Sequence, residues 1–285
     1  MVTGSTIYQS LGLDGLKVQR DHFDKVVYGI QPIEKPPDVL TAMEHGTKNE
    51  INAVATLVGE ILPVLYPDHM YTEEGCIQIS FKDTPFMVIS PDGSLGIELD
   101  GQILTSSAVE FKCPLRDVHY ELPQRYYLQC LSTMESLDVD RMLYISWTET
   151  LTTVLEVQEN TEFYSEVLDL ATEIFACDKP KRPCKLHVQV KLIKERIALN
   201  CAKASFIGEF PSQSSSEHIS SHEKDHITQD YLKRLLDSIN DLLKESYELQ
   251  RQKASEASVF LCSDLDRTWS KHQLRWSPVC WFPKG

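Results

Sequence analysis

Residues 85–114, PFMVISPDGSLGIELDGQILTSSAVEFKCP, decide the fold that we expect for this chain. Two apolar runs within it, 86–89 and 108–111, are rich in β-branched and aromatic residues, which is typical of strands. Asp92 lies just past the first run, and Glu110 lies inside the second. The stretch therefore predicts two strands that bring two carboxylates together on one side of a bent sheet.

Lys112 follows Glu110 at a spacing of two, so both side chains point to the same face of the predicted strand. Two acids and a lysine suit metal-dependent cleavage of phosphodiester bonds, because Mg²⁺ takes hard oxygen ligands and a fixed ammonium stabilises charge on phosphate. The alternative is purely structural. Ser-Pro-Asp-Gly (90–93) is also a good turn, and Glu-x-Lys on a strand is usually a solvated face. The two signals together, in this order, favour a site.

The motifs Ser-Pro-Asp-Gly and Glu-Phe-Lys-Cys-Pro resemble the signature of the PD-(D/E)xK nuclease superfamily, within it the YqaJ/lambda-exonuclease type of viral recombinases. The resemblance implies an α/β fold with a restriction-endonuclease-like core, a central mixed sheet flanked by helices. It also implies that Asp92, Glu110 and the backbone carbonyl of Phe111 hold Mg²⁺, for which Mn²⁺ can substitute, and that Lys112 is catalytic.

Two helical segments extend the resemblance. His-Gly-Thr-Lys-Asn-Glu (45–50) fits the family's G-x-x-x-E, so Glu50 carries over as an outer acidic residue of the catalytic set. Tyr126 and Gln129 fit the Y-x-x-Q of the helix after the sheet, at an i, i+3 spacing that shares one face. They carry over as active-site or DNA-contacting residues.

Two further features bear on the resemblance. Thr-Gly-Ser (3–5) matches the end of a segment that meets the DNA 5′ phosphate, so Ser5 carries over as a DNA contact, although no arginine precedes it. The alternative is that Ser5 caps a helix at 6–11. Asp92 and Glu110 are 18 positions apart (110 minus 92), which is long for the family, and we interpret 96–107 as a longer hairpin.

Periodicity predicts the other elements of the core. Residues 185–199 half-alternate and fit either a strand or a helix. The expected helices are 39–62, 122–134 and 161–175, and the expected strands are 71–81, 141–147 and 152–157.

The chain of 285 residues has room for one α/β domain and an appendage. We expect a nuclease-like domain at 1–210 with its core at about 40–178, a Ser-rich linker at 211–226, and a C-terminal helix and irregular tail at 227–285. The leucine stripe of 227–251 predicts a partner-binding or self-associating helix.

Composition limits the class of protein. No run of 18 apolar residues exists, so we expect no membrane span and a soluble intracellular protein of the nucleus or cytoplasm. None of the eight cysteines forms Cys-x-x-Cys, so we expect reduced thiols and no iron–sulfur cluster. The net charge of −14 opposes DNA binding, but seven lysines and arginines within 179–196 offer either a local phosphate path or merely a solvated face.

The leading interpretation is a Mg²⁺-dependent deoxyribonuclease that acts on duplex DNA ends in recombination or repair. Its exonuclease character and 5′-to-3′ direction rest on the family resemblance alone. One alternative is a structure-specific or RNA-active nuclease on the same core. A second alternative is a catalytically idle, nuclease-like interaction module, which a cleavage assay distinguishes from both enzymes.

Overall fold

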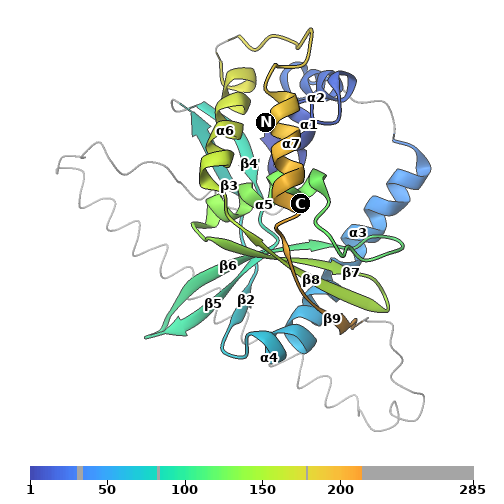
Figure 1. The fold of residues 1–285 in the computed structure, drawn as a ribbon, viewed down its shortest axis with the longest axis vertical. Helices are drawn as coiled ribbons and strands as arrows, with labels where there is room; N and C mark the ends of the chain where they lie inside the picture. Colours follow the sequence, from blue (N-terminus) through green and yellow to red (C-terminus); the bar gives the residue numbers. More distant parts are fainter. Residues whose placement is uncertain (31–34, 82–83, 178, 214–285) are drawn as a thin grey trace, which may run out of the picture. The chain divides into compact units, whose positions relative to one another are not determined.

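Strands form two sheets in the computed structural model, which describes residues 1–30, 35–81, 84–177 and 179–213 (Figure 1). Among these residues, the larger sheet has six strands in the order β2-β5-β6-β7-β8-β9, antiparallel except for the parallel pair β6 and β7. The smaller sheet has the order β1-β4-β3. The strands are β1 (Val2–Thr3), β2 (Met70–Thr72), β3 (Ile77–Phe81), β4 (Thr84–Ile89), β5 (Gly93–Leu99), β6 (Gln102–Lys112), β7 (Arg141–Trp147), β8 (Leu151–Gln158) and β9 (Ser205–Pro211).

Helices cover both faces of the larger sheet. Ala108 and Tyr144 belong to a core cluster with α1, α5, α6 and α7, whereas Val109 and Phe111 belong to a second cluster with α3 and α4. In Figure 1, α5, α6 and α7 lie above the sheet and α4 lies below it. The expected α/β fold, a central mixed sheet flanked by helices, is confirmed. The helices are α1 (Ile7–Ser10), α2 (Leu16–Tyr28), α3 (Pro37–Thr56), α4 (Leu62–Leu65), α5 (Gln124–Leu137), α6 (Thr161–Phe175) and α7 (Val190–Cys201), with a 3₁₀ turn at Gly4–Thr6 and a π turn at Leu57–Ile61.

The hairpin of β5 and β6 carries the candidate site. Its tip is Asp100–Gly101, and both residues have positive φ (53° and 78°), as a two-residue Asp-Gly hairpin turn requires. The predicted hairpin at 96–107 is thus confirmed, but its paired strands extend back to Gly93. The prediction that the 86–89 run and the strand of Glu110 belong to one bent sheet was wrong, because that run is β4 of the smaller sheet.

Helix α3 continues through the π turn into α4, so the predicted helix at 39–62 is confirmed with longer ends. Pro37 occupies the first turn, where its fixed φ suits a helix and its missing N–H is not needed. The inner side of α3 and the π turn places Ala53 and Leu57 against the sheet. The beginning of α3 exposes Val39 and Met43.

Several other elements differ from the sequence expectations. The predicted strand at 71–81 is two strands, β2 and β3, in different sheets, because Glu-Glu-Gly at 73–75 interrupts it. Helix α2 was not predicted, since its buried face holds Gln19 and His22 and so lacks apolar periodicity. The edge strand β9 was missed as well. Residues 185–199, left open between strand and helix, contain most of α7.

The hydrophobic core extends beyond the expected range of 40–178, because Val2, Ile7, Ile193 and Ile197 pack into the same cluster as the sheet. The linker at 211–226, apart from its first three residues, and the segment 227–285 lie outside the described residues. Of the described helices, none has the length and apolar character needed to cross a bilayer. The six cysteines in the described part are free thiols.

Candidate active site

Asp92 lies in the connection between β4 and β5, where backbone contacts fix it. Its Oδ2 accepts a hydrogen bond from the Phe111 N–H at 2.8 Å, and the Tyr71 hydroxyl donates to its carbonyl at 2.7 Å. A Cβ at position 93 would lie 2.3 Å from Tyr71 Cε2 and 2.8 Å from the Thr72 carbonyl oxygen. The absence of a side chain at Gly93 therefore permits the close approach of β2 beside Asp92.

The backbone of Phe111 faces Asp92. In an extended strand, the N–H and C=O of one residue point to the same edge. Since the Phe111 N–H donates to Asp92, the Phe111 carbonyl is directed to the same edge of β6. This orientation suits the ligand role that the resemblance implies for that carbonyl.

Glu110 on β6 is completely buried. Its Oε1 accepts hydrogen bonds from Lys112 Nζ and, at 2.5 Å, from Gln129 Nε2, whereas its buried Oε2 has no such donor. The charge of Asp92 acts on the Glu110 carboxyl group, and two carboxylates that repel each other in this way are relieved when one keeps a proton. A cation between them relieves the same repulsion and satisfies the Oε2 lone pairs.

The electrostatics of the group follow from its burial. Burial, opposed by Lys112 and reinforced by Asp92, raises the pKa of Glu110 to about 8. Burial also raises the pKa of Asp92, opposed by Lys112 and by the Phe111 amide. For Lys112, burial alone would lower the pKa, but the charges of Glu110 and Asp92 reverse this and raise it. The ammonium therefore stays charged at neutral pH, and the acid pair retains a proton unless a further cation binds.

Glu50 lies on α3, with an exposed side chain. The pKa of its carboxyl group is raised, first by partial desolvation and then by the charge of Asp92, and it is lowered by Lys112. Within the described part of the chain, no three His, Cys, Asp or Glu side chains are grouped closely enough to hold a metal ion. The structure thus places Glu50 within electrostatic range of the acid pair but outside it.

Helix α5 brings its two predicted residues to Lys112 and Glu110. Gln129 donates to Glu110 Oε1, and the Lys112 ammonium lies over the Tyr126 ring, 5.1 Å from its centroid. The i, i+3 spacing of Tyr126 and Gln129 places both on the face that covers β6. The spacing anticipated this common face.

Ser5 is not brought to this group. Its exposed hydroxyl lies 3.1 Å from Thr3 Oγ1, and no hydrogen bond among the described residues joins it to the acid pair. The capping alternative was wrong, because Ser5 lies inside the 3₁₀ turn and Thr6 precedes α1. That turn is closed instead by Thr6 Oγ1, which accepts from the Thr3 N–H at 3.0 Å. The predicted DNA contact of Ser5 stays a prediction.

Sequence reasoning missed two residues, His119 and Tyr144, whose rings pack against Tyr126. His119, in the connection between β6 and α5, has its Nδ1 2.7 Å from the Tyr144 hydroxyl oxygen. In the parallel register of β6 and β7, Tyr144 is opposite Glu110 and Ser146 is opposite Lys112. Polar groups two apart in the otherwise apolar strand of 141–147 were a usable signal for Tyr144. Nothing in the local sequence indicates His119.

The basic run at 179–196 is partly used for packing. Arg182 forms a bidentate pair with Asp24 of α2, and Arg196 pairs with Glu166 of α6. Lys194 donates to the Leu13 carbonyl oxygen at 3.3 Å. These contacts favour the structural interpretation for three of the seven cations.

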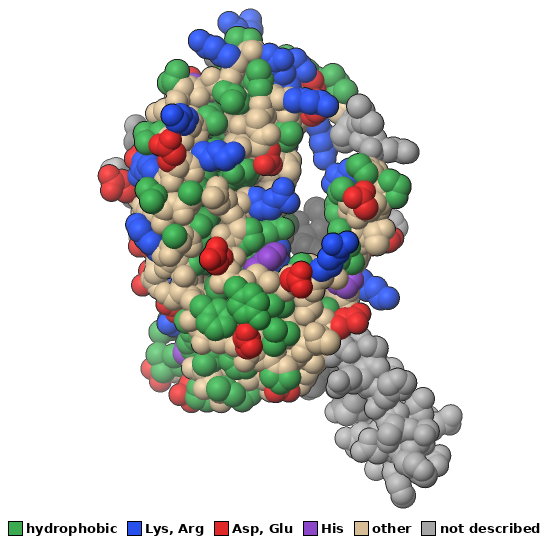
Figure 2. Space-filling view, turned by 45° about the vertical axis from the view of Figure 1, so that its right-hand side comes forward, with side chains coloured by type: hydrophobic (Ala, Val, Ile, Leu, Met, Phe, Trp, Pro, Cys, Tyr) green, Lys and Arg blue, Asp and Glu red, His purple; other side chains and the backbone are tan. Residues whose placement is uncertain are grey.

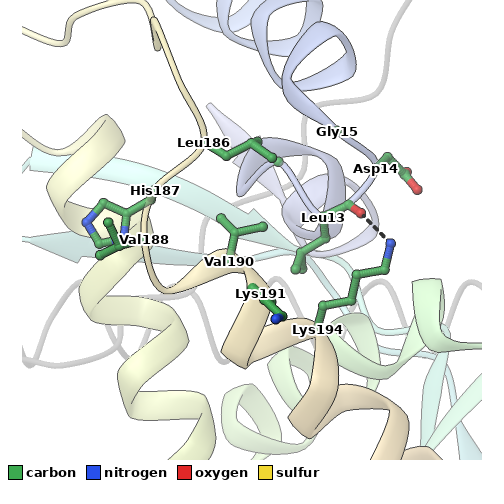
Figure 3. A pocket seen from close by; sticks show the side chains of 10 residues that line it. Leu13, Asp14, Gly15, Leu186, His187, Val188, Val190, Lys191 and Lys194 are labelled. Atoms are coloured by element: carbon green, nitrogen blue, oxygen red, sulfur yellow. Dashed lines mark hydrogen bonds between the residues drawn. The ribbon is translucent and has the colours of Figure 1, made fainter.

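A pocket of about 510 Å³ lies beside this run, between the α1–α2 connection and the start of α7 (Figure 3). Lys194, Leu13 and Val190 line it, and none of its lining residues belongs to the acid pair or to α5. Elsewhere, the space-filling view shows a hollow with Lys and Arg side chains along its rim (Figure 2). The surface is thus locally basic although the chain is acidic overall.

No family model matches the sequence, and no curated protein matches it. Among solved structures, the chain is similar to the alkaline exonuclease LHK-Exo from Laribacter hongkongensis. The identity is 16%, the match covers 71% of this chain and 93% of that one, and the TM-score is 0.44. The complex of LHK-Exo with dAMP gives the same values. The structure of SSO0001 is similar at 10% identity, over 63% of this chain and 78% of that one, with a TM-score of 0.35. Likenesses at this level carry no argument about the activity of this chain.

Proposed function

We propose that this chain is a metal-dependent nuclease of the PD-(D/E)xK type that hydrolyses phosphodiester bonds at the ends of duplex DNA, in the 5′-to-3′ direction. The observation that carries the nuclease proposal is Glu110. One oxygen of this buried carboxylate is held by Lys112 and Gln129, while the other is buried without a partner, and the charge of Asp92 acts on the group. DNA as substrate, action at ends and direction come from the motif resemblance and are tested separately.

The residues present fit Mg²⁺. Asp92, Glu110 and the Phe111 carbonyl would supply hard oxygen ligands, and the two carboxylates would bring the negative charge that a divalent cation neutralises. When Mg²⁺ is bound, the chemistry it supplies is activation of water and neutralisation of phosphate charge. Mn²⁺, which accepts the same ligands, would substitute.

The protein's own groups divide the remaining work. Lys112, fixed between Glu110 and the Tyr126 ring, holds a positive charge where a phosphate would gain negative charge. Gln129 orients Glu110 by holding one of its oxygens, and the other oxygen would be available to the cation. Glu50 adds negative charge at the edge of the site. The Tyr126 ring holds the Lys112 ammonium in place by a cation–π contact.

The proposal is tested with linear duplexes labelled at either the 5′ or the 3′ end, in Mg²⁺ and in EDTA. Mononucleotide release from the 5′ end, with a covalently closed circle left intact, supports a 5′-to-3′ exonuclease. Cleavage of the circle or of a matched RNA supports the structure-specific or RNA-active alternative. Absence of cleavage of every substrate supports the idle interaction module.

Asp92→Asn and Asp100→Asn make a matched pair for this assay. Both change an aspartate of the β4–β6 region to its neutral isostere, and Asn tolerates the positive φ of residue 100. Asp92→Asn should abolish cleavage, because a neutral amide oxygen replaces a charged ligand. Asp100→Asn, at the exposed hairpin tip, should cleave like the wild type. Retained cleavage by Asp92→Asn would refute the site assignment.

A further inference from the structure

The backbone of His119 is clamped at both of its polar groups. Its N–H donates to Ser146 Oγ at 3.0 Å, and its carbonyl accepts from Thr153 Oγ1 at 2.8 Å. Ser146 and Thr153 are both completely buried on the neighbouring strands β7 and β8. The position of His119 beside the sheet is therefore independent of its side chain, and substitutions of the ring leave this clamp intact.

The imidazole of His119 is hydrogen-bonded to Tyr144 through Nδ1. The Nδ1 of His119 lies 2.7 Å from the Tyr144 hydroxyl oxygen, and burial raises the pKa of that phenol well above its usual value, so the phenol keeps a proton that it can donate to Nδ1. Burial and the charge of Lys112 lower the pKa of His119, so the ring is neutral at pH 7. A neutral imidazole whose Nδ1 accepts must carry its hydrogen on Nε2.

The Nε2–H of His119 is left without a partner in the described residues and is not buried, so it reaches solvent. The ring packs 6.0 Å from Tyr126, whose own ring lies 5.1 Å below the Lys112 ammonium. A rigid neutral donor thus lies one aromatic ring away from the lysine of the candidate site.

We propose that His119 is a nucleic-acid-binding residue whose Nε2–H donates a hydrogen bond to a backbone phosphate oxygen of the strand held at the candidate site, and that Tyr144 is the positioning residue that fixes this donor. The inference rests on the proposed nuclease function. It adds a contact that the acid pair and Lys112 do not provide. A neutral donor grips phosphate without adding positive charge beside Lys112, which would weaken that lysine's hold on its proton.

Duplex affinity in EDTA, where no cleavage occurs, provides the first test. We expect His119→Ala to weaken binding of a short DNA duplex about tenfold, the lower end for a hydrogen bond to a charged group. The salt dependence should keep its slope, because a neutral donor releases no counterion. Tyr144→Phe should weaken binding less, and the double variant should match His119→Ala, since Tyr144 acts only through His119. Affinity losses that multiply in the double variant would overturn the positioning role.

The second measurement is the long-range ¹H–¹⁵N spectrum of the histidines. We expect wild-type His119 to show the neutral Nε2–H tautomer at pH 7, a mixture of tautomers in Tyr144→Phe, and an Nε2 shift on addition of duplex. His187→Ala, in the connection before α7, is the control and should change neither affinity nor these signals. In His119→Ala the Tyr144 hydroxyl loses its partner, whereas the double variant has no such hydroxyl. Weaker binding by the double variant therefore reflects loss of the His119 donor and not loss of folding.

The two proposals fail differently. If the wild type binds and cleaves DNA but the His119 Nε2 signal does not respond to duplex, the inference about His119 is overturned and the nuclease proposal stands. If the wild type neither binds nor cleaves nucleic acid, both are overturned.

Discussion

Glu110→Gln should abolish the proposed cleavage and, without metal, stabilise the fold in a way that depends on pH. The pKa of Glu110 is raised from 4.5 to about 8. The unfolded chain therefore loses this proton at a lower pH than the folded chain does, and wild-type stability falls as pH rises between these values. The neutral glutamine has no such dependence. The glutamine amide takes the place of the protonated carboxyl group, and in both side chains the same buried position lacks a hydrogen-bond partner. The variant and the wild type should therefore be equally stable near pH 4.5.

The size of the effect follows from the same numbers. Each pH unit in this range contributes about 1.4 kcal/mol, so from pH 4.5 to 7 the wild type loses about 3 kcal/mol relative to Glu110→Gln. For a chain of this size, that is about 6 °C in Tm. The difference should vanish near pH 4.5 and stop growing above pH 8. Mg²⁺ should raise the wild-type Tm and leave the variant nearly unchanged.

The assay is thermal unfolding in EDTA and in Mg²⁺ at several values from pH 4.5 to 9, with cleavage measured on the same samples. Glu98→Gln, on the exposed end of β5, is the matched control and should follow the wild type at every pH. Equal Tm values for Glu110→Gln and the wild type at both pH 5 and pH 8 would refute the raised pKa of Glu110. Retained cleavage would refute its role as a ligand.

Three further outcomes are expected. Lys112→Ala should lower single-turnover cleavage by at least about a hundredfold, about 3 kcal/mol of transition-state stabilisation, with metal binding nearly intact; a rate within threefold of wild type would make this lysine a surface charge. Cleavage should proceed in Mg²⁺ or Mn²⁺ and fail in Ca²⁺, whose looser coordination by six to eight ligands places water poorly; equal rates in Ca²⁺ would contradict the site described. Gly93→Ala should lower the free energy of unfolding by about 1–3 kcal/mol and impair cleavage, because the new Cβ would overlap Tyr71 and the Thr72 carbonyl. An unchanged Tm would show that β2 moves aside with no loss of stability.

The sequence predicted the parts of the site that depend on strand and helix periodicity. The two-residue spacing of Glu110 and Lys112 and the three-residue spacing of Tyr126 and Gln129 each define one face, whatever the neighbouring elements are. These pairs meet as their spacing indicates. Their roles in catalysis and metal binding stay predictions.

Partners distant in sequence were beyond these rules. Strand β5 contains Gly93, Gly96 and Glu98, so it lacks the apolar run by which β4 was recognised, and β4 was assigned to the sheet of β6 instead. The Asp-Gly at its tip was the better signal. His119 owes its position to hydroxyl groups on β7 and β8, which no local pattern reveals.

The candidate site is local in the chain, which has a consequence for folding. Asp92, Glu110, Lys112, Tyr126 and Gln129 all lie within 92–129, so assembling them closes only short loops, whereas pairing β9 with β8 closes a loop that includes α6 and α7. Folding therefore should order the β5–β6 hairpin before the β9 edge. Pulsed hydrogen exchange during refolding should protect β5 and β6 amides first, and simultaneous protection of β9 would contradict this order. A nascent chain would then assemble the acid pair before the sheet is complete, while the protein still lacks its final edge strand.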